Sequence, residues 1–283
     1  MLPLIWRCGR HQFELGPQPL VMGIVNVTPD SFSDGGRFAD PDLAIEHGLR
    51  LIRDGADILD IGGESTRPGA TAISLEEELR RVVPVVAGLA QRSSVPISVD
   101  TSKAEVARQC LDAGASIIND VTALLGDPRM SEVVAETGAG VVLMHMQGTP
   151  ATMQLAPAYS DVVAEVAAFL ECRLHALEIA GISPVAVCLD PGIGFGKTLQ
   201  HNLALLAHLE SLTRLGRPVC LGVSRKGFIG TLCNRALSNR DAGSLAVACF
   251  AAARGNTHII RTHDVASTRD AAVLLEAIDL ARR

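Results

Sequence analysis

The stretch of sequence that decides the fold is PISVDTSKAEVARQCLDAGASIINDV, residues 96–121. It starts with an apolar run, Pro96–Asp100, and ends with a second one, Ser116–Val121. Between the two runs, Ser102 and Glu105 have the spacing of a capping box, which satisfies backbone N–H groups at the start of a helix. A buried strand, a helix and another buried strand in this order predict two parallel strands joined by a helix.

The same alternation of apolar runs and helical stretches recurs along the chain. The runs are nearly all apolar instead of alternating, which is typical of strands buried on both faces of a parallel sheet. Eight strand–helix units are the number that closes into a (β/α)8 TIM barrel, so we expect an α/β fold of this architecture. The predicted strands are Leu20–Val27, Ala56–Ile61, Pro96–Asp100, Ser116–Val121, Gly140–Met146, Val185–Asp190, Pro218–Ser224 and His258–His263.

The helical stretches between these strands have recognisable starts. Ser74 and Glu77 again have capping-box spacing, and Asp127 followed by Pro128 indicates an N-cap and a first helical residue. Pro84 falls inside the helical pattern that Ser74 opens, where a proline removes a hydrogen bond and bends the helix. We still expect one helix there.

A short segment precedes the first predicted strand. Leu4–Leu15 predicts a small hairpin that turns at Cys8–Arg10 and covers the N-terminal mouth of the barrel. The chain contains no low-complexity tract and no interdomain linker, so residues 1–283 are expected to form a single domain.

Composition limits the class of partner and the compartment. The net charge of −6 argues against nucleic acid or an anionic membrane as the main partner. Neither a signal peptide nor a membrane-spanning apolar run is present, and the seven cysteines form no CxxC pair, so a cytoplasmic location is expected. Five cysteines lie in apolar segments and are interpreted as small core residues: Cys110, Cys172, Cys188, Cys220 and Cys249.

Nearly every predicted strand carries a polar residue at or near its carboxyl end. In a closed parallel barrel the carboxyl ends of the strands and the loops after them build the active site. Asp100, Asn119 and Asp190 lie at or near the ends of three of these strands and offer hydrogen-bond acceptors, which suits a flat heterocycle with several N–H groups. The sequence therefore predicts a binding site for a polar heterocycle at this mouth.

Cations of the same rim indicate an anion beside the heterocycle. Arg67 and Lys226 follow predicted strands, Arg261 and His263 lie at the end of one, and the forked guanidinium of arginine matches phosphate geometry. Asn26 precedes a loop, residues 28–36, that is rich in oxygen ligands and glycine, which suits a Mg²⁺ ion completed by water and substrate phosphates. The rim thus favours an enzyme that binds a phosphate or pyrophosphate.

Several other features have simpler interpretations. The segment 192–198, GIGFGKT, resembles a P-loop, but Pro191 stands where the first glycine is required, so a glycine-rich loop around a polar ligand is the better interpretation. His145 is more simply a rim histidine with satisfied hydrogen bonds than a catalytic one. Asp60 and Asp120 are more simply residues that hold loops.

Several ordered segments resemble the signatures of bacterial dihydropteroate synthases. Together they span residues 20–265, and their order along the chain is specific even where a single segment is not. They are GIVNVTPDSFSDGG (23–36), DIGGESTRPG (60–69), SVDT (98–101), IND (118–120), MHMQG (144–148), LDPGIGFGK (189–197), SRK (224–226) and RTHD (261–264).

This resemblance implies a reaction of folate synthesis. In it 6-hydroxymethyl-7,8-dihydropterin pyrophosphate and 4-aminobenzoate give 7,8-dihydropteroate and pyrophosphate, and sulfonamides compete with the aminobenzoate. The resemblance further implies a homodimer and Mg²⁺ as cofactor, with Asn26 as ligand and Asp34 as a further candidate.

The resemblance also assigns roles to the rim residues. Asp100, Asn119, Asp190 and Lys226 are expected to read the pterin edge. Residues expected around the pyrophosphate are Thr66, Arg67, Arg261 and His263, and those expected to frame the aminobenzoate are Phe32, Pro68, Phe195 and Lys226. Catalysis itself is expected from Lys226, Arg261 and His263.

One position departs from the family pattern. Many members carry a larger, often polar residue after the Ser-Arg-Lys segment, whereas this chain has Gly227, so a side-chain contact to the aminobenzoate is missing there. Three other functions stay open from the sequence: a pterin-dependent methyltransferase-type barrel, a non-catalytic pterin-binding paralogue, and a Schiff-base aldolase that uses Lys226.

Overall fold

Eight parallel strands form the centre of the molecule in a computed structural model that describes residues 4–28 and 40–281. The sheet order is β8-β7-β6-β5-β4-β3-β10-β9, and its two edge strands meet through a single bridge between Leu189 and Val219. The predicted barrel is therefore confirmed, with closure that is nearly complete. The strands are β3 Leu20–Asn26, β4 Ile58–Gly62, β5 Ile97–Asp100, β6 Ile117–Asp120, β7 Gly140–Met144, β8 Val187–Asp190, β9 Cys220–Gly222 and β10 Ile259–Thr262.

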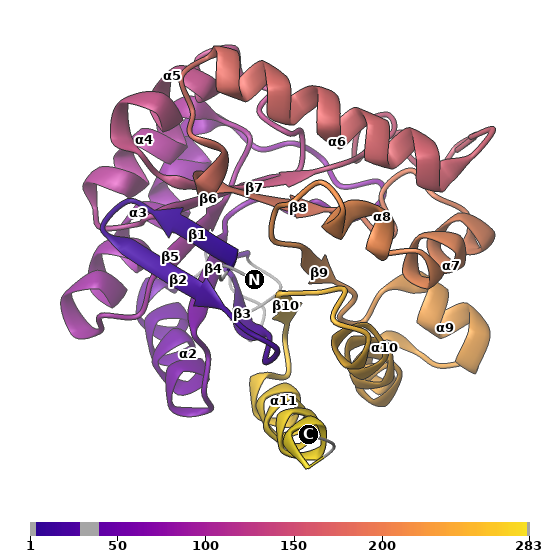
Figure 1. Cartoon of the computed structure of the whole chain (residues 1–283). Helices are drawn as coiled ribbons and strands as arrows, with labels where there is room; N and C mark the ends of the chain where they lie inside the picture. The colour runs from indigo at the N-terminus through magenta and orange to yellow at the C-terminus, as the bar shows by residue number, and fades with distance from the viewer. Residues whose placement is uncertain (1–3, 29–39, 282–283) are drawn as a thin grey trace.

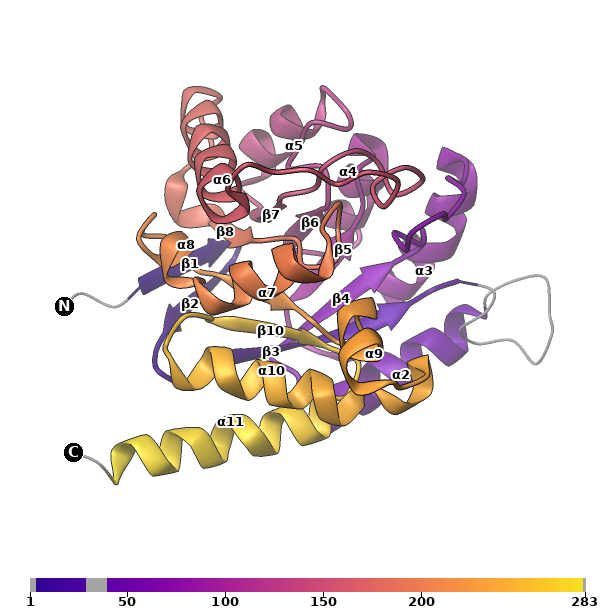
Figure 2. The ribbon, with the colours of Figure 1, turned by 90° about the vertical axis from the view of Figure 1, so that its right-hand side faces the viewer.

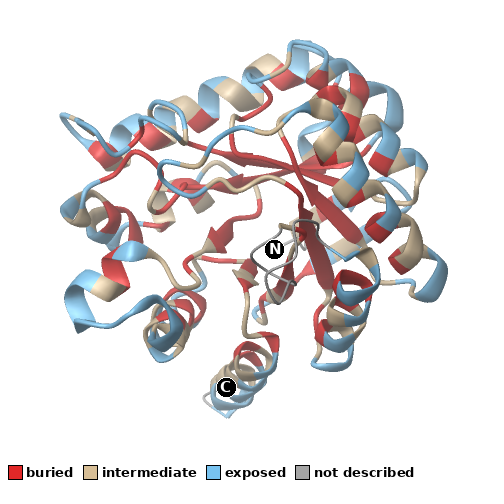
Figure 3. Ribbon diagram, turned by 180° about the vertical axis from the view of Figure 1, so that it is seen from behind, coloured by how far each residue is buried: buried red, intermediate tan, exposed pale blue. Residues whose placement is uncertain are grey.

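Helices surround this sheet and cover its outer face (Figure 1). Figure 3 shows the pattern of burial, with buried strands inside and helices that are exposed on their outward faces. No helix of the described residues is long and apolar enough to cross a membrane. The helices are α2 Pro41–Arg53, α3 Leu75–Arg92, α4 Ala104–Asp112, α5 Met130–Thr137, α6 Val162–Ile179, η1 Pro184–Ala186, α7 Leu199–Ala207, α8 Glu210–Thr213, α9 Gly227–Cys233, η2 Leu237–Asn239, α10 Asp241–Ala253 and α11 Val265–Leu280.

The predicted hairpin closes one end of the barrel. Strands β1 (Leu4–Cys8) and β2 (His11–Leu15) pair antiparallel, and Figure 2 shows them at the end opposite to α9. Trp6 is fully buried among apolar side chains from the lower ends of the strands, and its indole N–H donates to the Ala186 carbonyl at 2.9 Å. The hairpin thus covers the N-terminal mouth and leaves the carboxyl ends of the strands accessible.

The helix starts agree only in part with the sequence patterns. Ser74 caps α3 by accepting from the Glu77 N–H, and α3 runs through Pro84 as one helix. The predicted Ser102 cap of α4 is wrong, because the first N–H of that helix donates instead to Asp127 Oδ2 at 3.1 Å. Asp127 is not the N-cap of α5, which begins later, at Met130, although Asp127 Oδ1 accepts from the Arg129 N–H at 3.0 Å just before that helix.

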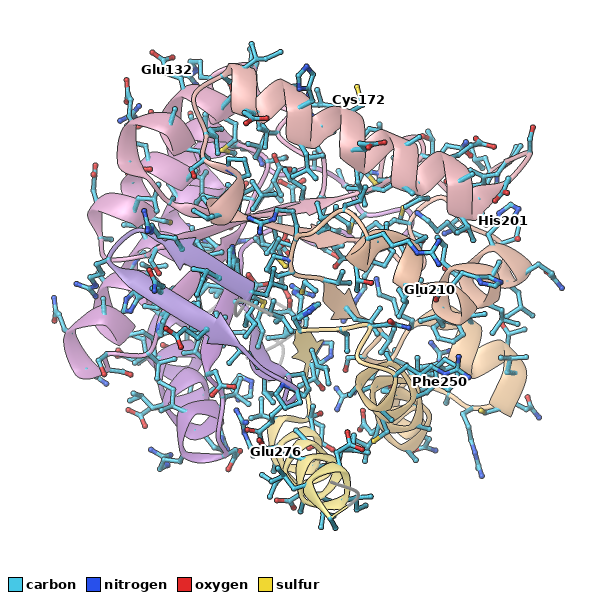
Figure 4. The ribbon with its side chains drawn as sticks, viewed as in Figure 1. Glu132, Cys172, His201, Glu210, Phe250 and Glu276 are labelled. Atoms are coloured by element: carbon cyan, nitrogen blue, oxygen red, sulfur yellow. The ribbon has the colours of Figure 1, made fainter. Side chains whose placement is uncertain are left out.

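The cysteines are also less uniform than predicted. All seven are unpaired, and Cys110, Cys188 and Cys220 are buried as expected. Cys172 is exposed on α6 and Cys249 is only half-buried, so the core interpretation was wrong for Cys172 (Figure 4). The reason is geometric: α6 is apolar over much of its circumference, so an apolar neighbourhood in the sequence does not identify its buried face.

Candidate active site

Strand register aligns polar residues at the carboxyl ends of four neighbouring strands. Asn26 of β3 pairs with Gly62 of β4, Gly62 pairs with Asp100 of β5, and Asp100 pairs with Asn119 of β6. Residues in register on adjacent strands point to the same side of a sheet. The absence of a side chain at Gly62 leaves room between Asn26 and Asp100, because a Cβ there would lie 3.9 Å from Asn26 Oδ1 and 3.6 Å from Asp100 Cβ.

Arg261 occupies the floor of this mouth, between two carboxylates. Its Nε donates to Asp60 Oδ2 at 2.6 Å and its Nη2 donates to Asp100 Oδ2 at 2.9 Å. Asn119 Nδ2 donates to the same Asp60 oxygen at 3.1 Å. Asp60 is fully buried, so its role is to hold Arg261 and Asn119 rather than a loop, which corrects the sequence interpretation.

Burial and neighbouring charges shift the pKa values of Asp100 and Arg261 at the floor of the mouth. Burial raises the pKa of Asp100 to about 7, with Arg261 acting in the opposite direction and the Asp60 carboxylate adding to the rise. Burial alone would lower the pKa of the Arg261 guanidinium, but Asp60 and Asp100 together raise it. Arg261 is therefore a permanent cation, while Asp100 can gain or lose a proton near neutral pH.

A second wall of the mouth comes from β8 and the turn after β9. Asp190 ends β8, and its Oδ1 accepts from the Gly192 N–H at 2.7 Å. Burial raises the pKa of Asp190, and burial lowers the pKa of Lys226 to about 8. The Lys226 ammonium lies 4.0 Å from the centre of the Phe195 ring, a distance at which a cation–π attraction operates.

Helix α10 fixes the turn that carries Lys226. Arg225 has a left-handed backbone, with φ of 58°, which is strained for any residue except glycine. Its N–H donates to Ser244 Oγ at 2.8 Å, and its guanidinium donates to both oxygens of Asp241. These contacts from α10 hold the strained turn and so place Lys226 at the mouth.

His263 follows β10 and pairs with the same turn. Its Nδ1 lies 2.9 Å from Ser224 Oγ, and its N–H donates to that oxygen at 3.2 Å. Burial lowers the pKa of His263 to about 3, and the neighbouring cations Arg261, Arg225 and Arg67 add to this effect. His263 is therefore neutral at ordinary pH and acts as a hydrogen-bonding group, not as a cation.

The loop after β4 carries Thr66, Arg67 and Pro68. Thr66 lines the mouth, whereas Arg67 and Pro68 are exposed beside it. The loop is anchored at its base, where Glu64 forms an ion pair with Lys103, which also pairs with the buried Glu78.

A pocket unites most of the predicted residues. Its lining includes every residue expected to read the pterin edge, together with Thr66, Phe195 and Arg261. Sequence reasoning missed its apolar walls, which alternation within each strand identifies, since Val121 is two residues after Asn119. The lining residues are Thr66, Asp100, Asn119, Val121, Met144, Asp190, Ile193, Phe195, Gly222, Lys226 and Arg261.

The remaining predicted residues lie outside this pocket. Asn26, Arg67, Pro68 and His263 do not line it, although Asn26 adjoins it through Gly62. Phe32 and Asp34 lie outside the described residues.

Two rim residues have the structural roles predicted for them. Asp120 is fully buried and holds the loop after β6, since its oxygens accept from the N–H groups of Thr122 and Leu124. His145 lies behind the mouth, with its Nδ1 3.0 Å from Lys197 Nζ. Neither residue lines the pocket.

The donor set at Asn26 fits Mg²⁺ in one respect. Asn26 Oδ1 is a neutral oxygen beside the Asp100 carboxylate, and Mg²⁺ prefers oxygen ligands while keeping several waters and substrate oxygens. Within residues 4–28 and 40–281 no group of three or more His, Cys, Asp or Glu side chains could hold a metal. The fit is therefore to an ion bound mainly by substrate and water.

Comparison with known proteins agrees with the pocket. The chain matches the family model of pterin binding enzymes over residues 22–263. It is 53% identical to the dihydropteroate synthase of Escherichia coli K12 over 259 residues, which are 92% of this chain and 91% of that protein. Xanthomonas albilineans dihydropteroate synthase, solved with 4-aminobenzoic acid, superposes with a TM-score of 0.91 at 50% identity and covers 98% of both chains.

A second structure of the Xanthomonas albilineans enzyme, in complex with 7,8-dihydropteroate, gives a TM-score of 0.87 at 47% identity over 97% of this chain and 98% of the other. Sequence identity of this order over nearly the whole length agrees with the sequence motifs, the barrel and the pocket, and all of them indicate the same family. The chain belongs to the dihydropteroate synthases, a family of transferases.

Proposed function

We propose that this synthase binds the pterin in the pocket at the carboxyl ends of its strands and binds 4-aminobenzoate beside Phe195. The convergence of Asp100, Asn119, Asp190 and Lys226 in one pocket carries the proposal. Family membership sets aside the methyltransferase-type barrel and the aldolase.

The pterin subsite pairs acceptors with ring N–H groups. The carboxylates of Asp100 and Asp190 accept from the amino and ring N–H groups of the pterin, and Lys226 donates to its acceptors. Each carboxylate keeps an oxygen for this task, because Asp100 gives one oxygen to Arg261 and Asp190 gives one to the Gly192 N–H. Buried groups of this kind reject a ligand that cannot satisfy them.

The pyrophosphate lies among Thr66, Arg67, Arg261 and His263. Two bonds to carboxylates use two of the five N–H donors of the Arg261 guanidinium, so three are left for an anion as far as the described residues extend. Arg67 is exposed and has no ion pair with another described residue, which leaves its charge available. Neutral His263 contributes a ring N–H.

The aminobenzoate is framed by Phe195, Pro68, Lys226 and Phe32. The Phe195 ring below the Lys226 ammonium supports this assignment, since an aromatic acid gains from a flat apolar wall next to a cation. Phe32 belongs to this proposal from the sequence alone.

Bond changes follow from this arrangement. The bond between the pterin methylene carbon and the pyrophosphate oxygen breaks with its electron pair on oxygen. The amine nitrogen of 4-aminobenzoate forms a bond to that carbon and then loses a proton. Arg67 and Arg261 stabilise the negative charge that develops on the departing group, and electrostatic stabilisation of this kind contributes most to lowering such a barrier. Walls that exclude water keep the electrophilic carbon for the amine.

Mg²⁺ belongs to the same proposal, with Asn26 as ligand and Asp34 as a second candidate. When bound, the ion would neutralise charge on the pyrophosphate oxygens. Asn26→Ala should therefore weaken Mg²⁺-dependent binding of pyrophosphate much more than binding of a pterin without pyrophosphate. Calorimetry that gives equal losses for both ligands would remove Asn26 from the metal site.

Pyrophosphate release tests the proposal as a whole. The purified protein should release pyrophosphate from the pterin pyrophosphate in the presence of 4-aminobenzoate, with an equal amount of dihydropteroate formed. A non-catalytic paralogue would bind the pterin by calorimetry and release nothing. Asp190→Asn and Lys226→Met should reduce the rate if the pocket is the active site.

The proposal includes a homodimer. Apolar side chains are exposed on α11 and on α10, the helix that packs beside it in Figure 2, and exposed apolar surface of this kind marks association sites. They are Phe250, Val273, Leu274, Ile278 and Leu280. In sedimentation, Leu274→Glu should dissociate the dimer, whereas Leu155→Glu, at an exposed loop elsewhere, should not.

We also propose a single pterin-binding domain and a cytoplasmic location. Packing of the hairpin into the barrel supports the first, because Trp6 is buried among strand residues. An odd number of cysteines without a CxxC pair supports the second.

A further inference from the structure

Lys197 is a buried lysine that the reaction leaves without a role. It ends the glycine-rich segment that resembles a P-loop, yet only 2% of it is exposed and it does not line the pocket. Its Nζ lies 3.0 Å from His145 Nδ1, 3.2 Å from the His145 carbonyl and 2.9 Å from the Phe195 carbonyl. An ammonium turned inward in this way cannot serve a phosphate at the mouth.

The three contacts match the three donors of an ammonium group. A protonated lysine has no acceptor, so His145 Nδ1 accepts and the ring proton lies on Nε2. Burial lowers the pKa of Lys197 to about 7, with Asp190 acting in the opposite direction and Lys226 adding to the fall. Burial and Lys197 lower the pKa of His145 to about 3, which keeps the imidazole neutral and able to accept.

The backbone of the segment around this lysine packs so closely against the residues after β7 that two of its positions have no space for a side chain. Gly192 and Gly196 have φ of 68° and 61°. A Cβ on Gly192 would lie 1.9 Å from the His145 carbonyl oxygen, and one on Gly196 would lie 2.4 Å from the Gln147 carbonyl oxygen. The ammonium sits 3.3 Å from the same Gly192 position, so it occupies the concave side of the segment.

Phe195 is the residue that this arrangement fixes. Its carbonyl accepts from Lys197, and its N–H donates to the Gly192 carbonyl at 3.0 Å. With both backbone groups held, the ring is directed into a cluster with Val121, Met144 and Met153, and under the Lys226 ammonium.

We propose that Lys197 is a positioning residue for 4-aminobenzoate, which acts by holding Phe195 in the orientation that forms the wall of that subsite. The inference rests on the proposed function only in assigning Phe195 to the aminobenzoate. Lys197 touches neither substrate.

A double-mutant cycle separates positioning from a general loss of stability. Lys197→Met keeps an unbranched side chain that is one atom shorter and removes the charge and all three donors. It should raise KM for 4-aminobenzoate about tenfold, and by less than about twofold when Phe195→Ala is already present, because residues that act through one another are not additive. The affinity for the free pterin should change by less than about twofold, since Gly192, Lys226 and Arg261 each act on the Asp190 carboxylate more strongly than Lys197 does.

Thr198→Ala is the matched control. Thr198 caps α7 by accepting from the His201 N–H, so its loss destabilises the neighbouring helix without touching the ammonium. KM for 4-aminobenzoate should stay unchanged in this variant. An equal rise in Thr198→Ala and Lys197→Met would mean that stability alone is measured, and the inference would be overturned.

The outcomes also separate this inference from the proposed function. If Phe195→Ala leaves KM for 4-aminobenzoate unchanged, the assignment of Phe195 fails and the inference fails with it. If Phe195→Ala raises KM and Lys197→Met does not, or if the effect of Lys197→Met is undiminished in the Phe195→Ala background, the inference alone fails.

If Lys197→Met shows no cooperative thermal unfolding in circular dichroism, Lys197→Arg is used in its place. It keeps the charge, but a planar fork does not match three acceptors arranged for an ammonium. It should raise KM for 4-aminobenzoate by a smaller factor of about threefold that again depends on Phe195. An unchanged KM in a folded Lys197→Arg variant would overturn the inference.

Discussion

The two ends of the barrel are built from the same strands and have opposite chemistry. At the N-terminal end, the hairpin packs Trp6 and Cys8 against apolar residues of the strands, which include Met22 and Ile58. At the carboxyl end, the strands present ionisable residues, and Arg261 lies between carboxylates.

Along a strand, the change from apolar to ionisable side chains occurs over a single two-residue repeat. Inward-facing residues are two apart, and over that step β4 passes from Ile58 to Asp60, while β8 passes from Cys188 to Asp190. The lower layer is close-packed and closed to solvent, whereas the upper layer holds charges that burial has shifted in pKa. Stability and function are therefore separated along the barrel axis, and substitutions at the two ends should have different consequences.

The largest effect is expected from Trp6→Ala. Removing a fully buried indole leaves a cavity and strands the Ala186 carbonyl, which should lower the free energy of unfolding by about 3–5 kcal/mol. Urea unfolding followed by circular dichroism measures this, with Trp6→Phe as the milder control. Both KM values should stay unchanged where the variant is folded; a shift in either would show that the two ends are coupled.

Gly140→Ala should give the next largest loss of stability. Gly140 starts β7, and a Cβ there would lie 2.4 Å from Cys8 Sγ and 3.1 Å from Cys8 Cα in the hairpin. Since backbone has to move, about 1–3 kcal/mol of unfolding free energy should be lost. Cys8→Ala in the same chain removes the contact with Sγ and should restore part of the loss, which would confirm the contact; an additive double variant would contradict it.

Asp190→Asn should affect binding instead of stability. An amide keeps an acceptor for the Gly192 N–H but loses the second acceptor that the pterin requires, so affinity for the free pterin should fall by at least about tenfold. The free energy of unfolding should change by less than about 1 kcal/mol, because the neutral amide loses favourable contacts of the carboxylate but also removes the cost of burying its charge. A large loss of stability with unchanged affinity would place Asp190 in the scaffold.

The sequence predicted the strands well because their signal is local. The runs are nearly all apolar and carry polar residues at or near their carboxyl ends, so all eight strands were predicted within a few residues, and alternation then identifies the side chains that face inward. Helix starts were less predictable: α4 receives its capping oxygen from Asp127, which lies beyond the following strand. A contact of that kind depends on the tertiary fold and leaves no local pattern.

Pairing between charges was the other part that the sequence left undecided. Arg261 was expected beside the pyrophosphate, but its guanidinium also pairs with Asp60 and Asp100, although strand register sets Arg261 level with Met22 and Ile58. Truncation of Arg261 should therefore disturb the pterin subsite as well, through Asp100. Sequence motifs identify which residues lie at the mouth, but the arrangement of the strands in the barrel determines which of these residues contact one another.

The pH dependence of pterin binding should reveal the state of Asp100. Burial raises its pKa to about 7, so the carboxylate that accepts from the pterin is lost as pH falls through that value. Affinity for the free pterin should fall by up to about tenfold between about pH 8 and about pH 6. In Asp100→Asn this fall should disappear in calorimetry, and only the opposite effect of Lys226, which loses its proton above a pKa of about 8, should remain. A slope that persists in this variant and disappears in Asp190→Asn would assign the titration to Asp190.

The smallest effect is expected from Gly227→Ser at the open end of the barrel. Gly227 is the first residue of α9, directly after Lys226, and among the described residues no atom beyond its chain neighbours and its own helix backbone lies within 4 Å of the position of an added Cβ. In contrast to Gly140, this site accepts a side chain without moving its neighbours, and the new hydroxyl can donate to the carboxylate of 4-aminobenzoate. KM for 4-aminobenzoate should fall about threefold, within the range of one added hydrogen bond, while stability stays within about 0.5 kcal/mol. An arylamine without the carboxylate is the control and should show no change; if its KM falls equally, the gain comes from the shape of the pocket and not from the hydroxyl.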